Sequence, residues 1–333
     1  MSRTLASLSI SAMLLAGTGM ADVPRVVTDI APVHSLVARV MQGTGSPDLI
    51  LPPGASPHEY SLRPSEAAAL QDADIVIWMG PQLAPWMRDA IETLASKADH
   101  LTLLEAAETR LLDIREGALF ESHSHGDDDH GHDDDHADGD HAHEHEDDHH
   151  HDHAEDEEHA QDHGAHDAHA WLSPENAAVW VDLIAAELSS ADPENADNYL
   201  ANAAAAREEL AGLSADVIAI LDPVRSKSFI VFHDAFQYFE ADFDFPAAGA
   251  ISLSDAAAPS PARIAEIQER VRHEEVDCVL AEPQFNPGLV STVLDGTDAN
   301  TAIIDPIGAT LEPGPGLYPQ LIRNIATTLA SCL

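Results

Sequence analysis

The sequence Asp74-Ile75-Val76-Ile77-Trp78-Met79 is a short apolar run that ends at the turn-forming pair Gly80-Pro81. The run is continuously apolar rather than alternating, which is typical of a strand in a parallel sheet whose two faces are covered by helices. Working outward, we expect further strands at 26–28 and 49–51, and helices at 34–41, 67–72 (with Ser65 as its cap) and 86–97. This alternation of strand and helix predicts an α/β block.

The same alternation returns in the last third of the chain. There we expect strands at 229–232, 278–281 and 302–304, and helices at 263–273, 289–294 and 318–329. Between the two blocks, a helix is expected at 175–188, and a longer one begins with Asp192 as its cap. The longer helix continues to about Leu221, which is roughly 40 Å at 1.5 Å per residue. The sequence therefore predicts two α/β lobes, each a parallel-rich sheet flanked by helices, joined by one long rigid helix.

The stretch 121–166 differs from the rest of the chain. Its 46 residues hold 15 of the 21 histidines and 19 of the 59 acidic residues, and no Lys or Arg. It has almost nothing apolar to bury, so we expect a disordered insertion that attracts metal ions. It would raise the local concentration of the metal, and hand metal to an ordered site or sense its abundance, or it would act only as a passive buffer.

The first residues are typical of a secretory signal peptide. Arg3 supplies the positive start, residues 5–16 are apolar but too short to span a bilayer, and Gly19-Met20-Ala21 resembles a cleavage site. We expect four parts: a signal peptide at 1–21, an N-terminal lobe with the insertion at 22–190, the linking helix at 191–223 and a C-terminal lobe at 224–333. The mature protein is expected to be exported and free in solution, and a monomer.

The charge restricts the ligand. The formal net charge is −44, and it is still −25 without the 19 acidic residues of the insertion. Nucleic acid is excluded as a partner, because phosphate binding needs a basic surface. An acidic protein attracts cations, although an acidic surface also simply keeps a protein soluble.

Only two cysteines are present, Cys278 and Cys332. In an exported protein such a pair usually forms a disulfide, which here would tie the last residues of the chain to the start of a strand. The alternative is two buried free thiols.

Polar residues follow the predicted strands at their carboxyl ends. His233 ends one strand, Glu282 and Asp305 follow two others, and His58 lies in the loop after the 49–51 strand. Ligands of open α/β sheets bind outside the carboxyl ends of the strands, so these residues are expected to converge on a cleft between the lobes. His169, near the linking helix, can reach the same cleft.

His58, His169 and His233 are the candidate metal ligands. Their wide spacing excludes a zinc finger and indicates a site assembled by tertiary structure. Three imidazoles and one oxygen suit zinc. Weaker candidates are His34, which sits where a helix starts, and His100 and His273, which we expect in charged helical surroundings exposed to solvent.

Several fragments, in this order, resemble one family. The fragments are Pro53-Gly54-Ala55-Ser56-Pro57-His58-Glu59-Tyr60-Ser61-Leu62-Arg63-Pro64-Ser65, His169-Ala170-Trp171-Leu172-Ser173-Pro174, Phe232-His233-Asp234-Ala235-Phe236, Ala281-Glu282-Pro283-Gln284-Phe285 and Ile304-Asp305-Pro306-Ile307-Gly308. Together they resemble the zinc-binding periplasmic solute-binding proteins of ABC importers (the ZnuA type, cluster A-I), over nearly all of the mature chain. The insertion and the late cysteine pair also look like the zinc branch of this family.

The resemblance implies two lobes joined by a rigid helix, with zinc held between them by His58, His169 and His233. Manganese-preferring relatives typically have Glu at the third position, so His233 points to zinc. Some zinc members use an acidic residue immediately before the first histidine as a fourth ligand, but this chain has Pro57 there. The fourth position is left to Asp305, to water or to a group from the insertion.

The resemblance also implies a function without catalysis: capture of zinc in the periplasm and its delivery to an ABC permease and ATPase at the inner membrane. One alternative is a periplasmic zinc buffer or metallochaperone that serves no permease. Another is a zinc hydrolase, in which Glu282 would be the base beside an open coordination position.

Overall fold

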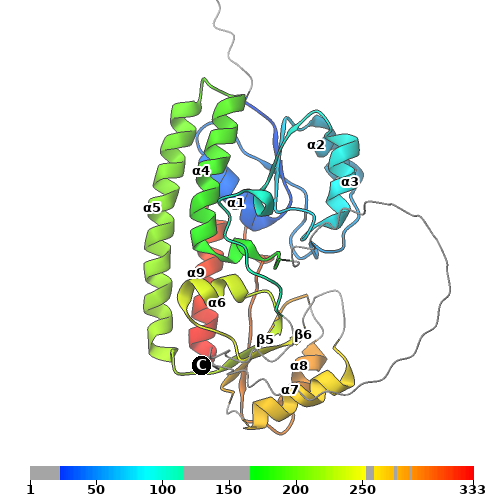
Figure 1. The fold of residues 1–333 in the computed structure, drawn as a ribbon, viewed down its shortest axis with the longest axis vertical. Coiled ribbons are helices and arrows are strands. Elements are labelled where there is room, and N and C mark those ends of the chain that lie inside the picture. The colour runs from blue at the N-terminus through cyan, green and yellow to red at the C-terminus, as the bar shows by residue number, and fades with distance from the viewer. Residues whose placement is uncertain (1–22, 116–165, 253–258, 274–275, 285–286) are drawn as a thin grey trace, which may run out of the picture.

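The structure is a computed structural model that describes residues 23–115, 166–252, 259–273, 276–284 and 287–333 (Figure 1). The expected signal peptide and positions 121–165 of the histidine-rich insertion lie outside the described residues. The N-terminal lobe is built on a parallel sheet in the order β2-β1-β3-β4. Its strands are β1 (Val26–Thr28), β2 (Asp48–Leu49), β3 (Ile75–Trp78) and β4 (Asp99–Thr102), and its helices are α1 (Ala31–Val40), α2 (Pro64–Asp72), α3 (Pro85–Leu94) and the 3₁₀ helix η1 (Leu103–Glu105). Strand β3 is buried at every position, as its continuously apolar sequence predicts.

The C-terminal lobe repeats this plan with a parallel sheet in the order β6-β5-β7-β8. Its strands are β5 (Phe229–His233), β6 (Gly249–Ser252), β7 (Cys278–Ala281) and β8 (Asn300–Ile303), and its helices are α6 (Gln237–Phe243), α7 (Pro261–His273) and α8 (Pro287–Leu294). A disulfide joins Cys278 at the start of β7 to Cys332, so the predicted pairing of the two cysteines is confirmed. It ties the C-terminal helix to the second sheet.

A wall of long helices runs along one side of both lobes (Figure 1). It consists of α4 (Pro174–Ala191), α5 (Ala196–Leu221) and α9 (Leu317–Cys332), with the 3₁₀ helices η2 (Ala170–Leu172) before α4 and η3 (Asp222–Val224) after α5. Helix α5 is about 39 Å long at 1.5 Å per residue, and it packs against α4, α9 and α1. The prediction of two α/β lobes with one long helix is confirmed. Across the described residues, none of the helices combines the length and the apolar composition that crossing a membrane requires.

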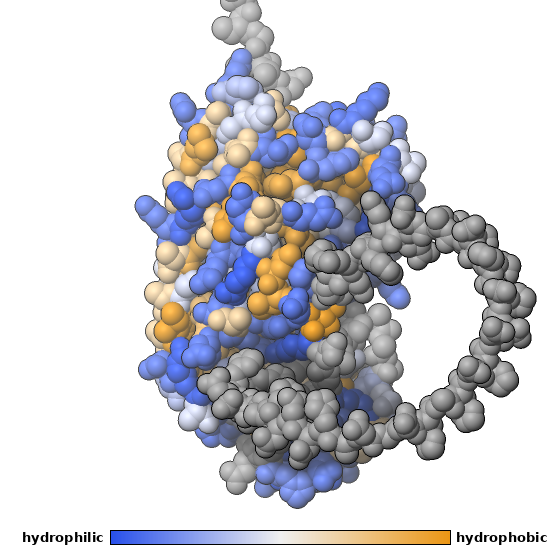
Figure 2. Space-filling model, viewed as in Figure 1, coloured by the Kyte–Doolittle hydropathy of each residue, from blue (hydrophilic) through white to orange (hydrophobic). Residues whose placement is uncertain are grey.

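The two lobes share one hydrophobic core. A single cluster of buried side chains includes Ile77 of the first sheet, Leu213 of α5 and Phe239 of α6. Two smaller clusters cover the other faces of the sheets, one around Val76 and one around Val279. On the face drawn in Figure 2, hydrophobic side chains gather toward the middle, whereas hydrophilic ones dominate the margins. Shared packing of this kind favours a rigid junction between the lobes, because interiors are close-packed and resist deformation.

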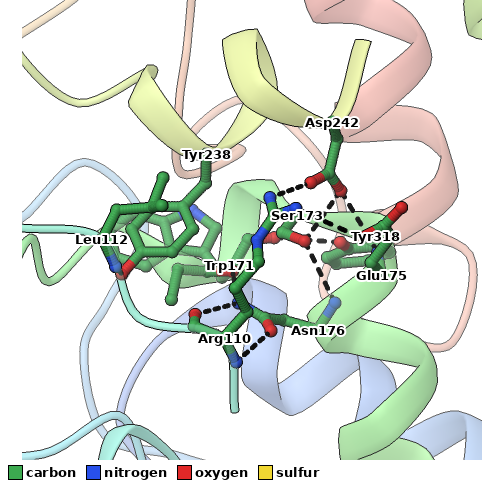
Figure 3. A network of polar contacts seen from close by, with 10 residues as sticks. Arg110, Leu112, Trp171, Ser173, Glu175, Asn176, Tyr238, Asp242 and Tyr318 are labelled. Carbon is green, nitrogen blue, oxygen red and sulfur yellow. Dashed lines mark hydrogen bonds and ion pairs between the residues drawn. The ribbon is translucent and has the colours of Figure 1, made fainter.

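A polar network adds to this junction (Figure 3). Arg110 forms ion pairs with Asp242 of α6 and, at 3.2 Å, with Glu175 of α4. The hydroxyl of Ser173 donates to Asp242 at 2.7 Å. Burial raises the pKa of Asp242, which Ser173 and Arg110 counteract by stabilising its charge. The segment that carries Arg110 therefore links the N-terminal lobe to α6 of the C-terminal lobe.

Three local predictions were wrong. Ser65 lies inside α2, whose cap is Arg63, and the Glu66 side chain accepts the Arg63 backbone N–H at 2.7 Å. Asp192 ends α4 rather than capping α5; it is buried, and its carboxylate accepts from Tyr199 at 2.9 Å. His100 lies on strand β4, not in a helix, because pairing with β3 overrides the polar composition of this edge strand.

Asp29 connects β1 to β3 inside the N-terminal lobe. One carboxylate oxygen accepts the backbone N–H of Ile30 and the other that of Met79, each at 2.8 Å. Burial raises the pKa of Asp29 from 3.8 to about 6, and the two backbone N–H groups oppose this rise. The carboxyl group binds its proton more tightly in the folded than in the unfolded chain. Its contribution to stability is therefore complete below about pH 3.8 and is lost as the pH rises through about 6.

The variant Asp29→Asn tests this link. An amide presents an N–H group to one of the two backbone donors, so we expect it to lower the free energy of unfolding by about 1–3 kcal/mol. The amide does not titrate. The difference in free energy of unfolding between the wild type and the variant should therefore increase by about 1 kcal/mol as the pH is lowered from 8 to 5. Urea unfolding of both proteins with a chelator present measures both effects. A pH-independent difference would contradict the assigned titration.

Candidate metal site

His58 lies in the loop that follows β2. Its backbone N–H donates to Ser56 Oγ at 3.2 Å. The loop is anchored to α3, because Trp86 Nε1 donates to the carbonyl of Pro57 at 2.8 Å and the Trp86 ring packs edge-on against Tyr60 at 5.5 Å. The proline- and glycine-rich sequence is thus held against the helix instead of extending into solvent.

His169 lies immediately before η2, in the segment that leads into α4. One oxygen of Asp167 accepts the His169 backbone N–H at 2.9 Å and lies 2.7 Å from the His169 ring Nδ1. Asp167 is itself fixed: its N–H donates to the Leu112 carbonyl at 2.8 Å, and its carbonyl accepts from the Tyr238 hydroxyl at 2.9 Å. The position of His169 therefore depends on Tyr238 of α6, in the other lobe.

His233 is the last residue of β5 and is 4% exposed. Glu282 follows the neighbouring strand β7. One oxygen of Glu282 lies 2.5 Å from the His233 ring Nδ1 and 3.2 Å from its backbone nitrogen. The other oxygen accepts from Gln284 Nε2 at 2.9 Å. Both residues lie at carboxyl ends of parallel strands, where the sequence pattern predicts ligand binding.

The structure brings these three histidines together. The ring centroids of His58 and His169 are 5.7 Å apart, and those of His169 and His233 are 5.3 Å apart. Two imidazoles bound tetrahedrally to zinc at about 2.0–2.1 Å have centroids roughly 5 Å apart. Both measured spacings are thus within about 1 Å of the spacing that a shared zinc ion requires.

Two cavities adjoin the three rings. His58, His169 and His233 all line one of about 100 Å³, together with Trp171 and Pro283. They also line a second cavity of about 170 Å³ on the side of the insertion. Within the described ranges, no group of three or more His, Cys, Asp or Glu side chains already has the geometry to hold a metal. Zinc binding therefore requires a small change in the relative positions of these side chains.

Asp305 occupies a different position. It lines a neighbouring cavity beside α9, and not either of the two cavities that the histidines share. Its Oδ1 accepts the backbone N–H groups of Ile307 and Gly308 at 3.1 and 2.9 Å. Its Oδ2 is buried and makes no hydrogen bond to the described residues. That oxygen is available for coordination, but only after a change in position.

The weaker candidates lie outside this cluster. His34 is buried in α1 beside the carbonyl of Pro47 at 3.2 Å, and burial lowers its pKa. His100 is exposed on β4 and contacts the carbonyl of Ala95 at 3.0 Å, and His273 is exposed at the end of α7. None of the three lines the two cavities around the candidate ligands.

A buried ion-pair cluster lies beside His233. Arg115, the last described residue before the insertion, pairs with Asp234 and with Glu240 of α6. Burial raises the pKa of Glu240, and Arg115 counteracts this by favouring the charged form. At the other end of the insertion, His166 pairs with Asp113 through an isolated β-bridge. The described residues on either side of the insertion, Arg115 and His166, therefore lie next to the candidate site.

The contact of Asp167 with His169 was not predicted from the sequence. Glu282 was expected at the end of a strand, but its contact with His233 was not predicted. The two-residue spacing of Asp167 and His169 is the local signal that could have been used, because an Asp side chain readily bonds a backbone N–H two residues later.

Comparisons with known proteins identify the family. The family model for ZnuA, described as "Zinc-uptake complex component A periplasmic", matches residues 26–332. A protein of Brucella abortus (strain 2308) named "High-affinity zinc uptake system protein ZnuA" is 45% identical over 308 residues, covering 92% of this chain and 91% of that protein. The protein of that name from Paracoccus denitrificans (strain Pd 1222) is 42% identical over 314 residues, covering 94% and 93%.

Solved structures share the fold. A zinc-bound deletion mutant of ZnuA aligns with a TM-score of 0.70 and 20% identity, over 93% of this chain and 98% of that one. The laminin-binding adhesin Lmb of Streptococcus agalactiae, as a mutant structure, aligns with a TM-score of 0.71 and 23% identity, over 93% and 99%.

Proposed function

Because this chain belongs to the ZnuA family of zinc-uptake components, we propose that it captures zinc in the periplasm and delivers it to an ABC-type membrane permease for import. The observation that carries the proposal is the convergence of His58, His169 and His233, from both lobes, on shared cavities. Zinc is the cargo, and neutral imidazoles are among its preferred ligands.

The three imidazoles are the protein ligands in this proposal. Asp305 or a water molecule completes the tetrahedron, and the unbonded Oδ2 of Asp305 supports the first choice. Placement of Asp305 in a separate cavity supports the second. Closed four-ligand coordination would hold zinc more tightly, whereas a bound water would ease its release to the permease.

The remaining assignments follow from the same function. Residues 1–21 act as a cleaved signal peptide, and the mature chain is a periplasmic monomer with lobes at 22–190 and 224–333 and a linking helix at 191–223. Its partners are the permease and its ATPase. No covalent bond is made or broken, so the chain is not an enzyme, and the contacts of Glu282 with His233 and Gln284 support an orienting rather than a catalytic role.

A zinc titration of the mature protein lacking residues 122–165 tests the proposal. The bridge between Asp113 and His166 holds together the described residues that flank this part of the chain, so the deletion should leave the two lobes intact. We expect one site with sub-micromolar affinity, which corresponds to roughly 8 kcal/mol or more. Loss of all tight binding with the deleted segment would mean that the insertion, and not the cavity between the lobes, is the zinc site.

A further inference from the structure

Two of the three candidate ligands, the half-buried His169 and the buried His233, share one kind of contact. In each case a single carboxylate oxygen lies against the backbone N–H and the ring Nδ1 of the same histidine. For His169 the oxygen belongs to Asp167, two residues earlier, at 2.9 and 2.7 Å. For His233 it belongs to Glu282, 49 residues later and directly after the adjacent strand β7, at 3.2 and 2.5 Å. The same arrangement is thus built twice, once in each half of the site, from unrelated parts of the chain.

This contact determines which ring nitrogen carries the proton. A backbone N–H can only donate, so the oxygen beside it must be an acceptor. The ring Nδ1 that faces the same oxygen therefore carries the proton and donates it. In a neutral imidazole the lone pair is then on Nε2, which is the atom that binds a metal.

The surroundings strengthen both contacts. The side chains of Glu282 and His233 are 0% and 5% exposed, and those of Asp167 and His169 are 6% and 12% exposed. Water cannot compete well at this depth, so the charged hydrogen bonds are stronger than at a surface. Each carboxylate is fixed in turn, Glu282 by Gln284 and Asp167 through its backbone by Tyr238.

We propose that Asp167 and Glu282 are positioning residues that hold His169 and His233 with the proton on Nδ1, so that Nε2 of each ring faces the zinc ion before it arrives. This inference rests on the proposed function. A carboxylate behind the ring also makes Nε2 a more basic ligand and offsets part of the charge of the bound ion.

The test uses the mature chain with and without residues 122–165 and the variants Glu282→Gln and Asp167→Asn, and the affinities are compared in the shortened chain, where the histidines of the insertion cannot mask them. Both variants keep the shape and an acceptor oxygen but remove the negative charge. We expect each to weaken zinc binding by about 10- to 100-fold. The matched control is Asp242→Asn, which removes another buried carboxylate at the lobe junction whose described partners include Arg110 and Ser173. Its zinc affinity should change less than threefold, whereas general loosening of the fold would weaken all three variants alike.

A second measurement does not depend on any variant. Nitrogen-15 NMR of the histidine rings distinguishes the two neutral tautomers. In the zinc-free wild type we expect His169 and His233 with the proton on Nδ1, and in the loaded protein a large shift at Nε2. A ring found with its proton on Nε2 before zinc is added would overturn the inference for that histidine.

Failure of this inference can be told apart from failure of the proposed function. If zinc binds tightly and shifts the three ring signals, but Glu282→Gln and Asp167→Asn bind as the wild type does, only the positioning roles are wrong. If zinc leaves the ring signals of His58, His169 and His233 unchanged, the site itself is wrong.

Discussion

Replacing His233 by Ala is expected to weaken zinc binding to the mature protein by roughly 100- to 1,000-fold. A zinc site with four protein ligands contributes about 10–16 kcal/mol, or roughly 3–4 kcal/mol for each ligand. Losing one imidazole should therefore raise the Kd by two to three orders of magnitude, at about 1.4 kcal/mol per factor of ten. His233 is suited to this test because it ends a buried strand and faces His169 at 5.3 Å.

The measurement is a competitive titration with a chromophoric chelator, carried out on protein that lacks residues 122–165. Removing the insertion matters, because its many histidines would mask the loss of one ligand. His100→Ala serves as the matched control, since His100 is exposed on β4 and lines neither cavity at the site. Equal zinc affinities for the two variants would contradict the assignment of His233 as a ligand.

Removing the disulfide is expected to destabilise the protein by about 4 kcal/mol. The bond joins residues 54 positions apart, and closing a loop of that length restricts the unfolded chain by about this amount. Both cysteines are buried, at 0% and 5% exposure, so replacement by Ala also leaves a small cavity, which reduction of the wild type does not. The bond also holds the end of α9, a helix that packs against α5, and its loss should let that end fray.

Thermal unfolding of the Cys278→Ala/Cys332→Ala variant should show a midpoint lower by roughly 10 °C. Wild-type protein in strong reductant should approach the same midpoint, and reductant should have no further effect on the variant. An unchanged midpoint in both experiments would show that the cysteines are not joined in the purified protein.

Much of the fold is predictable from local sequence. The run Ile75–Trp78 is buried at every position, as its uniform apolarity indicates, and the spacing of Tyr199, Leu213 and Val217 predicts the buried face of α5. Two of the four edge strands, β4 and β6, were missed. Strand β4 is exposed or half-buried along its length, so its sequence lacks the apolar signal.

Helix caps were also predicted poorly. Ser65 and Asp192 are typical cap residues, yet one lies within α2 and the other ends α4. In each case another contact is made instead. The Glu66 side chain accepts the backbone N–H of Arg63 at the start of α2, and the Asp192 carboxylate accepts the hydroxyl of Tyr199. Local preference for a cap is worth only about 1 kcal/mol, so tertiary contacts can override it.

The sequence by itself determined the two α/β lobes, the long helix and the three histidines, because strand and helix periodicities are local and because parallel strands place their carboxyl ends on one edge. Only the tertiary structure decided which carboxylates belong to which histidine. Glu282 contacts His233, which is 49 residues away in the sequence, because β5 and β7 are neighbours in the sheet. Asp305 accepts the N–H groups of Ile307 and Gly308 instead. A hydrogen bond depends on tenths of an ångström and on direction, and these are properties of the packed chain that residue types and spacing do not encode.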